Sequence, residues 1–369
     1  MSLPTLDEVR HDTRGATRHA PLARDVLTLT GGVVVLPPAV AFNAIQAQER
    51  HHGYRHLLLP QARFARPRGH GALTPDEAAR LAPGGRPTLR IAPPGRSLAD
   101  LAADAALDLR DQLGSGQLAR TTHVLVASCA LNETIGDSVV GRMQYELGLQ
   151  RVMPLALGQN GTLGWYSALT LLDGLLGPDD QALVIVSDKW LYPFFRQFGD
   201  LVGYGDAAAA MLVNRAGPAP DGAAWGGLRG VALAFGESIA EPWAAEPGAL
   251  RDTLAPIAAR AIQHALDAAA LRADQIDWCA PPGFDPEFTA RVANAASLPL
   301  GCRMQHDLAG HLSSADSAAA LIRLASALDE GERRTVLVWD AALHGAAAAA
   351  VCDVTGGFDA ALDIDGDAR

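Results

Sequence analysis

Short apolar runs alternate with amphipathic stretches along most of the chain. Apolar runs of roughly four to eight residues are typical of buried strands, and apolar positions that recur about every 3.6 residues are typical of helices packed on a sheet. The helical period predicts helices at residues 98–113, 138–147 and 163–176, the first with Ser97 as its N-cap. The apolar runs predict buried strands at residues 123–127, 153–157 and 183–187.

The same alternation continues to the C-terminus. It predicts strands at residues 228–235 and 276–280, helices at 250–270, 286–296 and 314–328, and a closing hairpin of 335–339 with 346–354. Strands that alternate with helices favour a layered α/β sheet with right-handed crossovers.

Composition shifts suggest the domain organisation. Residues 216–227 are rich in Gly, Pro and Ala, which predicts a surface connection between two halves. We therefore expect a polar arm at residues 1–25, a first half at 26–215 and a second half at 216–369. Residues 53–96 hold many Pro, Gly and Arg residues, and either cover an entrance or partner surface or form a surface loop.

Composition and charge exclude several classes of function. The 369 residues are 49% hydrophobic and 19% charged, which suits a globular interior, and the net charge of −11 argues against a nucleic-acid partner. The first residues lack the apolar core of a signal peptide, and no apolar run is long enough to span a membrane. The four cysteines are widely spaced, so we expect a cytoplasmic protein with reduced thiols and no metal site.

A glycine turn in the middle of the chain is the first candidate for chemistry. The stretch PLALGQNGTLGWYSA, residues 154–168, runs from a predicted strand through a turn into a predicted helix. Such a turn presents one side chain at a helix N-terminus, where unpaired N–H groups favour negative charge. That side chain would belong to Thr162, although a plain strand-to-helix turn has the same pattern.

Several motifs in order resemble the ketoacyl-ACP synthase III branch of the thiolase superfamily. They are SVVGRMQYELG before the turn, ALVIVSD and GYGDAAAAMLV after it, and DWCAPP and AGHLSSADSAAA later. The resemblance runs from about Leu27 to the C-terminus. It implies an α/β thiolase fold, in which two similar strand-helix halves form a five-layer αβαβα architecture.

The resemblance fails at the residues that carry the family's chemistry. Thr162 occupies the position of the family's nucleophilic cysteine, Pro282 that of its histidine and His311 that of its asparagine. The segment Trp339-Asp340-Ala341 replaces a late glycine-rich loop that shapes the oxyanion hole. Because fold does not determine function, the activity has to be argued separately.

Four residues are candidates for a replaced catalytic site. A Thr162 nucleophile would form an oxyester and would need a base, which Pro282 cannot supply. His311 could act as general base on a hydroxyl or amine, with His344 nearby, or both could be structural histidines. Cys129, at the end of a predicted strand, could be a relocated nucleophile or a small buried apolar residue.

Three further positions would shape an acyl channel. Gly136 stands where the resembling family often has a bulky gate residue, Trp165 begins the central helix, and Gly205 lies in the segment beside the family's active site. The channel is therefore expected to be reshaped or filled by the protein itself. Asp188 and Asp206 match family positions that hold turns.

Two hypotheses of function follow. The first is a triad-less partner subunit of a ketosynthase pair in acyl-chain or specialised-metabolite biosynthesis, dimerising with itself or with a catalytically intact relative. The second is a divergent acyltransferase without a cofactor, which moves an acyl group from CoA or acyl-carrier protein to a hydroxyl or amine with His311 as base.

Two further interpretations, a dinucleotide site and a docking patch for an acyl-carrier protein, are weaker. A dinucleotide-binding oxidoreductase is disfavoured because GQNGTLG lacks the G-x-G-x-x-G spacing. An acidic acyl-carrier protein would need a basic patch, for which Arg63, Arg66, Arg68 and Arg142 are candidates unless they are ordinary surface arginines.

Overall fold

The computed structural model describes residues 27–41, 88–93, 95–129, 132, 136–190, 196–215, 224–239, 242, 245–358 and 360–363. The predicted arm at residues 1–25, most of the 53–96 region, and Arg63, Arg66 and Arg68 lie outside these residues. The boundary between the expected halves also lies outside them, so its position stays a prediction.

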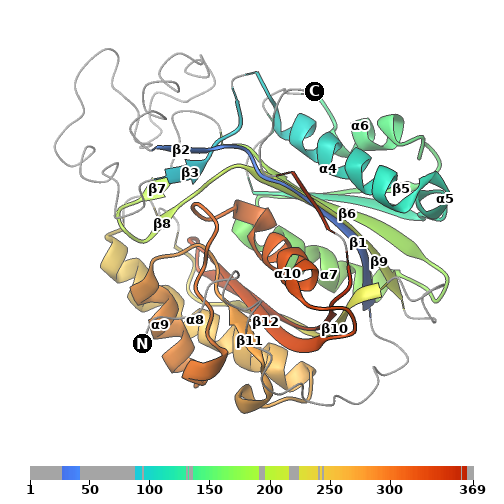
Figure 1. Cartoon of the computed structure of the whole chain (residues 1–369). Helices are drawn as coiled ribbons and strands as arrows, with labels where there is room; N and C mark the ends of the chain where they lie inside the picture. The colour runs from blue at the N-terminus through green and yellow to red at the C-terminus, as the bar shows by residue number, and fades with distance from the viewer. Residues whose placement is uncertain are drawn as a thin grey trace, which may run out of the picture.

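The first half of the chain forms one half-sheet (Figure 1). Its strands are, in spatial order, β1 (Leu27–Val35), β9 (Ala207–Arg215), β6 (Gln181–Asp188), β4 (His123–Ser128) and β5 (Met153–Gly158). The pairs β1–β9 and β9–β6 are antiparallel, whereas β6–β4 and β4–β5 are parallel.

The second half repeats this order. Its strands are β10 (Ala224–Phe235), β13 (Ala346–Thr355), β12 (Arg333–Ala342) and β11 (Trp278–Ala280), joined by two antiparallel pairs and then a parallel one. Antiparallel pairing of β1 with β10 joins the two half-sheets into one path. The short β14 (Ala361–Asp363) lies parallel to β1.

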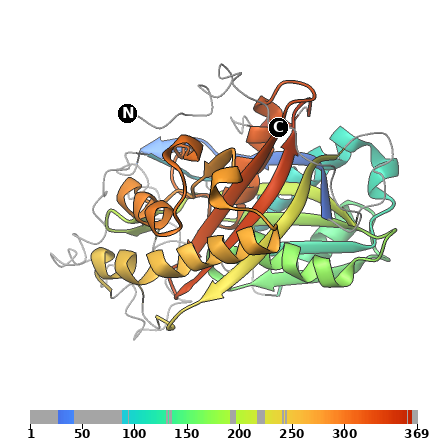
Figure 2. The same cartoon turned by 90° about the horizontal axis from the view of Figure 1, so that it is seen from below.

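Helices complete five alternating layers, as the resemblance to the thiolase superfamily implies (Figure 1). Two helices lie between the half-sheets, and the others cover the outer faces; Figure 2 shows the long α8 across the lower face of the sheet. The inner helices are α7 (Gly164–Leu175) and α10 (Asp316–Ala327). The outer ones are α4 (Leu98–Leu113), α5 (Ser115–Leu118) and α6 (Val139–Glu146) on one side, and α8 (Pro247–Ala268) and α9 (Pro286–Ala295) on the other.

The α4 helix follows directly from its sequence. The Ser97 hydroxyl accepts the N–H of Asp100, and the Asp100 carboxylate accepts the N–H of Ser97, so two otherwise unpaired donors are satisfied. Its leucines and alanines recur on one face, which is buried against β1, β6 and β9. The helix ends at Gly114, whose φ is +79°.

The innermost layer explains the apolar composition of the two central helices. α7 and α10 touch sheet on both sides, and their large side chains, including Trp165 and Tyr166, are fully buried. Alanine runs in β9 and β13 place small side chains on the faces of the sheet where helices pack, so the helices can approach closely. A helix enclosed in this way gains burial from most of its circumference.

The prediction of a buried strand at residues 153–157 is wrong. β5 pairs with β4 alone among the described strands, so it forms the edge of the sheet. Only Leu155 and Leu157 pack against the core, whereas Met153 is 55% exposed. An apolar run cannot distinguish an edge strand from a central one, because the exposure depends on what pairs with it.

Two short ribbons border the centre of the molecule. β2 (Ala39–Ala41) pairs with β3 (Thr88–Arg90), and β7 (Gln197–Phe198) pairs with β8 (Val202–Gly203).

Within the described part of the chain, none of the helices has the length and apolar character needed to cross a membrane.

Candidate functional site

The turn that presents Thr162 is a short 3-10 helix, Gly161–Leu163, between β5 and α7. Gly161 has a φ of +54°, and a Cβ there would lie 2.5 Å from the Cβ of Ala342 in β12. Thr162 is 3% exposed, and its Oγ1 donates to the carbonyl of Ala341 across 3.5 Å. The turn is therefore pressed against β12 and has room for no side chain at position 161.

His344, in the turn that joins β12 to β13, lies beside the Gly161–Leu163 turn. Its ring atoms Cε1 and Nδ1 would lie 3.2 and 3.3 Å from a Cβ on Gly161. The side chain is half-buried, and this burial lowers the pKa of His344, so the neutral imidazole is favoured. Gly161 and His344 are thus close neighbours.

His311 is fully buried, and both ring nitrogens are occupied. Its Nδ1 accepts the backbone N–H of Ser313 at 3.0 Å, so in the neutral ring the proton is on Nε2, which lies 3.0 Å from Oδ1 of Asp340. Ser313 has a φ of +54°, an unfavourable conformation that directs its N–H back to the ring. This arrangement holds the imidazole but leaves no nitrogen for a substrate.

Aromatic rings and backbone close the space around His311. Tyr204 and Phe284 meet its ring edge-to-face, with centroids 5.3 and 5.1 Å away. Its backbone bonds to both Gly203 and Gly205. Gly283 approaches so closely that a Cβ there would lie 2.4 Å from the Cα of His311. Pro282, at the position of the family's histidine, is buried next to this contact.

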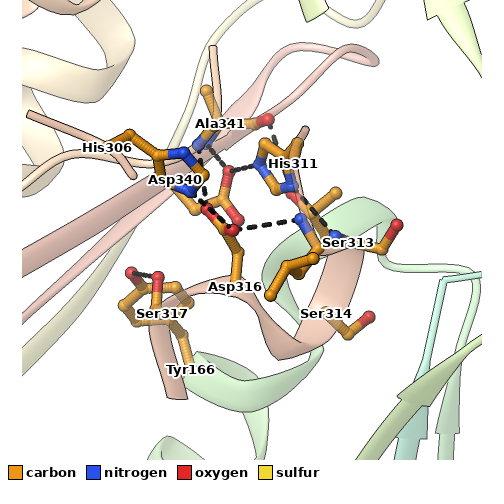
Figure 3. A network of polar contacts seen from close by, with 12 residues as sticks. Tyr166, His306, His311, Ser313, Ser314, Asp316, Ser317, Asp340 and Ala341 are labelled. Carbon is orange, nitrogen blue, oxygen red and sulfur yellow. Dashed lines mark hydrogen bonds and ion pairs between the residues drawn. The ribbon is translucent and has the colours of Figure 1, made fainter. Parts of the chain in front are cut away.

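Two buried carboxyl groups, those of Asp316 and Asp340, lie at the centre of this region (Figure 3). Their pKa values shift in opposite directions. Burial alone would raise the pKa of Asp316, but His306, His311 and the N–H of Leu312 hold it well below its usual range. Burial raises the pKa of Asp340, and the bonds from His311 and the Ala341 N–H only partly oppose this. Asp316 is therefore the carboxyl group of the two whose ionised form is favoured.

Cys129 directly follows β4, which ends at Ser128. Its N–H donates to Asp188 Oδ1 at 2.7 Å, and the other oxygen of Asp188 accepts the N–H of Ser314 at 2.8 Å. Burial raises the pKa of the Cys129 thiol well above its usual value, and Asp188 and Asp340 add to the effect. The thiol is therefore protonated near neutral pH, which does not favour a nucleophile.

The three expected channel residues differ in their surroundings. Gly136 sits in an exposed turn with no atom near the position of a Cβ. Trp165 is fully buried in the core, and its Nε1 has no hydrogen-bond partner. Gly205 is buried, and a Cβ on it would lie 3.0 Å from the carbonyl oxygen of Arg90, so it serves close backbone packing.

The structural roles expected of Asp188 and Asp206 are seen. Asp206 accepts the N–H groups of Ala92 and Trp190 and forms a buried ion pair with Arg196 at 2.7 Å. Neither Ser313 nor Ser314 caps α10, whose N-cap is Ala315. The Ser313 hydroxyl binds Trp190 and Gly205 instead, and the buried Ser314 hydroxyl has no partner.

Arg142, the one described member of the candidate basic patch, is already paired. Its guanidinium contacts Asp100 at 2.8 Å and Glu146 at 2.5 Å. Its charge is therefore largely compensated before any acidic partner approaches. In the described part of the chain, no group of three or more His, Cys, Asp or Glu side chains could hold a metal ion.

Three residues of this network were not predicted from the sequence: Asp340 as a partner of His311, and the pair His306 and Asp316. A signal existed for Asp340, because one acidic residue interrupts the apolar run TVLVWDAA. Asp316 gave none, since an aspartate at the start of a helix is ordinary.

Comparisons with solved structures agree on the architecture. The structure described as ChlB3, an acyltransferase, matches with a TM-score of 0.65 and 20% identity over 90% of this chain and 98% of the other. 3-Oxoacyl-(acyl carrier protein) synthase III, FabH, from Pseudomonas aeruginosa PAO1 gives 0.62 and 18% over 90% and 98%. An OleA variant from Xanthomonas campestris gives 0.63 and 14% over 90% and 99%.

The fold is the thiolase fold. No family model and no curated protein matches the sequence. Identities of 20% or less carry the architecture and not the activity, so the function has to be argued from the site itself.

The contact between Gly283 and His311 gives a first test. We expect Gly283→Ala to lower the free energy of unfolding by about 1–3 kcal/mol, because the new methyl group meets backbone. Gly174→Ala is the matched control, since Gly174 is exposed in α7 with open space around it. That change should be neutral or slightly stabilising. Equal urea denaturation midpoints for the two variants would contradict the close approach.

Asp316 gives a pH test. Its folded pKa is depressed, so its contribution to stability is present above the unfolded pKa of about 3.9 and is lost as the pH falls below it. Between pH 6 and 3, wild type should therefore lose about 1 kcal/mol more unfolding free energy than Asp316→Asn. Asp274→Asn, at an exposed carboxylate, is the control. Parallel pH profiles for wild type and Asp316→Asn would refute the assignment.

Proposed function

We propose that this chain is a ketoacyl-synthase-III-like subunit of acyl-chain or specialised-metabolite biosynthesis that carries no acyl intermediate of its own. It pairs with a catalytically intact ketosynthase and contributes structure to that pair. The thiolase fold, shared with synthase III and OleA structures, supports the setting. The geometry around Thr162 and His311 supports the absence of condensing chemistry.

The observation that carries the proposal is the engagement of His311. A nucleophile needs a base within hydrogen-bond reach that can take its proton. The hydroxyl of Thr162 points to a backbone carbonyl, which cannot take a proton, and Pro282 has no titratable group. His311 is 0% exposed and uses both nitrogens within the protein, so it has none for Thr162 or for an acceptor.

The edge of β5 supports pairing with a second thiolase-fold subunit. Edge strands expose unpaired N–H and C=O groups and are ready to pair with another chain. Three large apolar side chains are exposed on this strand and on the two helices that contact it: Met153 at 55%, Tyr145 of α6 at 77% and Leu175 of α7 at 43%. A second copy or a related subunit would cover them.

Direct acyl transfer is the second candidate. It is favoured by the similarity to a structure described as an acyltransferase. The donor would be acyl-CoA or acyl-carrier protein, and the acceptor a hydroxyl or amine. The geometry disfavours His311 as the base, because its two hydrogen bonds would have to break first. His344, which is less buried and has a lowered pKa, is the better placed histidine.

Intact-protein mass spectrometry tests the absence of an acyl intermediate. We expect no added acyl mass after incubation with a panel of acyl-CoA and acyl-carrier donors, while a catalytically intact synthase III run in parallel becomes acylated. An adduct that peptide mapping places on Thr162 or Cys129 would overturn the proposal. Donor consumption that requires an added alcohol or amine, without any adduct, would favour direct transfer instead.

A charge on β5 tests the pairing surface. We expect a dimeric mass by light scattering, either for the chain alone or after co-expression with an intact ketosynthase, and a monomer for Met153→Glu. The charge would have to be desolvated in the interface. Phe235→Glu is the control, because Phe235 is 66% exposed on β10 in the other half of the sheet. A Met153→Glu variant that stays dimeric would rule out this edge.

A further inference from the structure

A cavity lies between α9 and the segment of residues 303–310 that leads to His311. Its volume is about 530 Å³, and neither Thr162, His344 nor Cys129 lines it. Cavities of roughly 300–1,000 Å³ with mostly apolar walls and a few polar groups are typical of small-molecule sites. The cavity is therefore a candidate binding site apart from the family's triad positions.

The apolar wall of this cavity is held in place by the interior behind it. Phe284 packs on Phe288 with ring centroids 4.9 Å apart, and Phe288 packs on Trp339 at 6.0 Å. Gly310 approaches the core so closely that a Cβ on it would lie 2.4 Å from a methyl carbon of Leu89. Side chains fixed in this way cannot easily collapse into the space, so the cavity is preformed.

The rim of the cavity is open to solvent. Pro286 and Ala290 of α9 are exposed, and so is Leu300, at 73%. A small molecule can therefore enter without a rearrangement of the core.

The charge of the lining has one sign. The chain carries 41 Asp and Glu residues and a net charge of −11, yet none of the described residues that line the cavity is acidic. Arg303 and His306 both line it. Asp316 contacts His306 without lining the cavity, and Asp307 is paired with Arg323. In an acidic protein, this apolar cavity thus offers a cation and no carboxylate.

Arg303 has donors left for a ligand. Its Nε and Nη2 donate to the carbonyl of Leu298 at 3.1 and 2.5 Å, whereas Nη1 makes no hydrogen bond and Arg303 no ion pair within the described residues. Arg303 also forms a β-bridge with Cys279, which lines the cavity. Burial raises the pKa of the Cys279 thiol, and the charge of Arg303 opposes this, so the charge acts at the cavity wall.

We propose that this cavity binds an apolar monocarboxylate of the size of a medium-chain fatty acid. Its hydrocarbon part would lie against the wall that includes Phe284 and Trp339, and its carboxylate would bind Arg303. Hydrogen bonds between a guanidinium and a carboxylate are among the strongest in proteins. The inference concerns a separate cavity and does not rest on the partner-subunit role.

Calorimetric titration of the full-length chain with octanoate, 1-octanol and acetate tests the site. Octanoate and 1-octanol share the hydrocarbon chain and differ in charge, so wild type should bind octanoate at least about tenfold more tightly. Acetate has the charge without the chain and should bind far more weakly than octanoate, because it buries little apolar surface.

Three variants separate the charge from the apolar wall. Arg303→Gln should lower the affinity for octanoate to that for 1-octanol and leave the affinity for 1-octanol unchanged. Ala290→Trp, on the exposed rim, should block both. Arg272→Gln is the matched control and should bind as wild type, because Arg272 is 73% exposed and does not line the cavity.

A spectroscopic readout locates the ligand. Met304 is buried and lines the cavity. In protein labelled with ¹³C-methyl methionine, its signal, identified with Met304→Leu, should shift when octanoate or 1-octanol binds. Thermal unfolding of each variant confirms that it is folded.

Four results would overturn the proposal. They are failure of octanoate to bind, equal affinities of wild type for octanoate and 1-octanol, a preference for octanoate that survives in Arg303→Gln, and an unchanged Met304 signal in saturated protein. The first two results need wild type alone, so they decide the proposal even where a variant does not fold.

Discussion

The carboxylate of Asp316 is the interaction on which the centre of this molecule depends. It accepts the N–H of Gly283 after β11, the N–H of Leu312 before α10, and the proton of His306. These bonds join three segments that approach within van der Waals contact. A buried charge is tolerated only when such donors replace its hydration, and removing them would leave it uncompensated.

The neighbouring pair of Asp340 and His311 shows how burial decides chemistry. Both pairs consist of an imidazole and a carboxylate, but Asp316 has two backbone donors besides its histidine and Asp340 has one. Burial raises the pKa of both carboxyl groups, but His306 and His311 together lower that of Asp316, whereas Asp340 has His311 alone and the nearby charge of Asp316 raises its pKa further. His311 also accepts a backbone N–H at its second nitrogen, whereas the second nitrogen of His306 has no partner. The same residue types thus give a closed structural unit and a unit that faces a cavity.

The residues at and beside the positions of the thiolase-family triad pack closely against their neighbours. Gly161 lies against β12, Gly283 lies against the backbone of His311, and aromatic rings cover the imidazole. A side chain at either glycine would meet atoms that cannot move freely. The region therefore has the character of a core, whereas the β5 edge and the cavity that His306 lines lie outside it.

The sequence by itself determined most of the helices and strands, because apolar period, capping residues and turn glycines act over a few neighbouring positions. The two repeated halves and the five layers were expected from the resemblance to the thiolase superfamily. Only the tertiary structure decided that β5 lies at the edge, that His311 is closed by Asp340 and Ser313, and that His306 keeps a free nitrogen beside a cavity. Those properties depend on contacts between residues distant in the chain, and on burial that changes pKa values, neither of which leaves a local pattern.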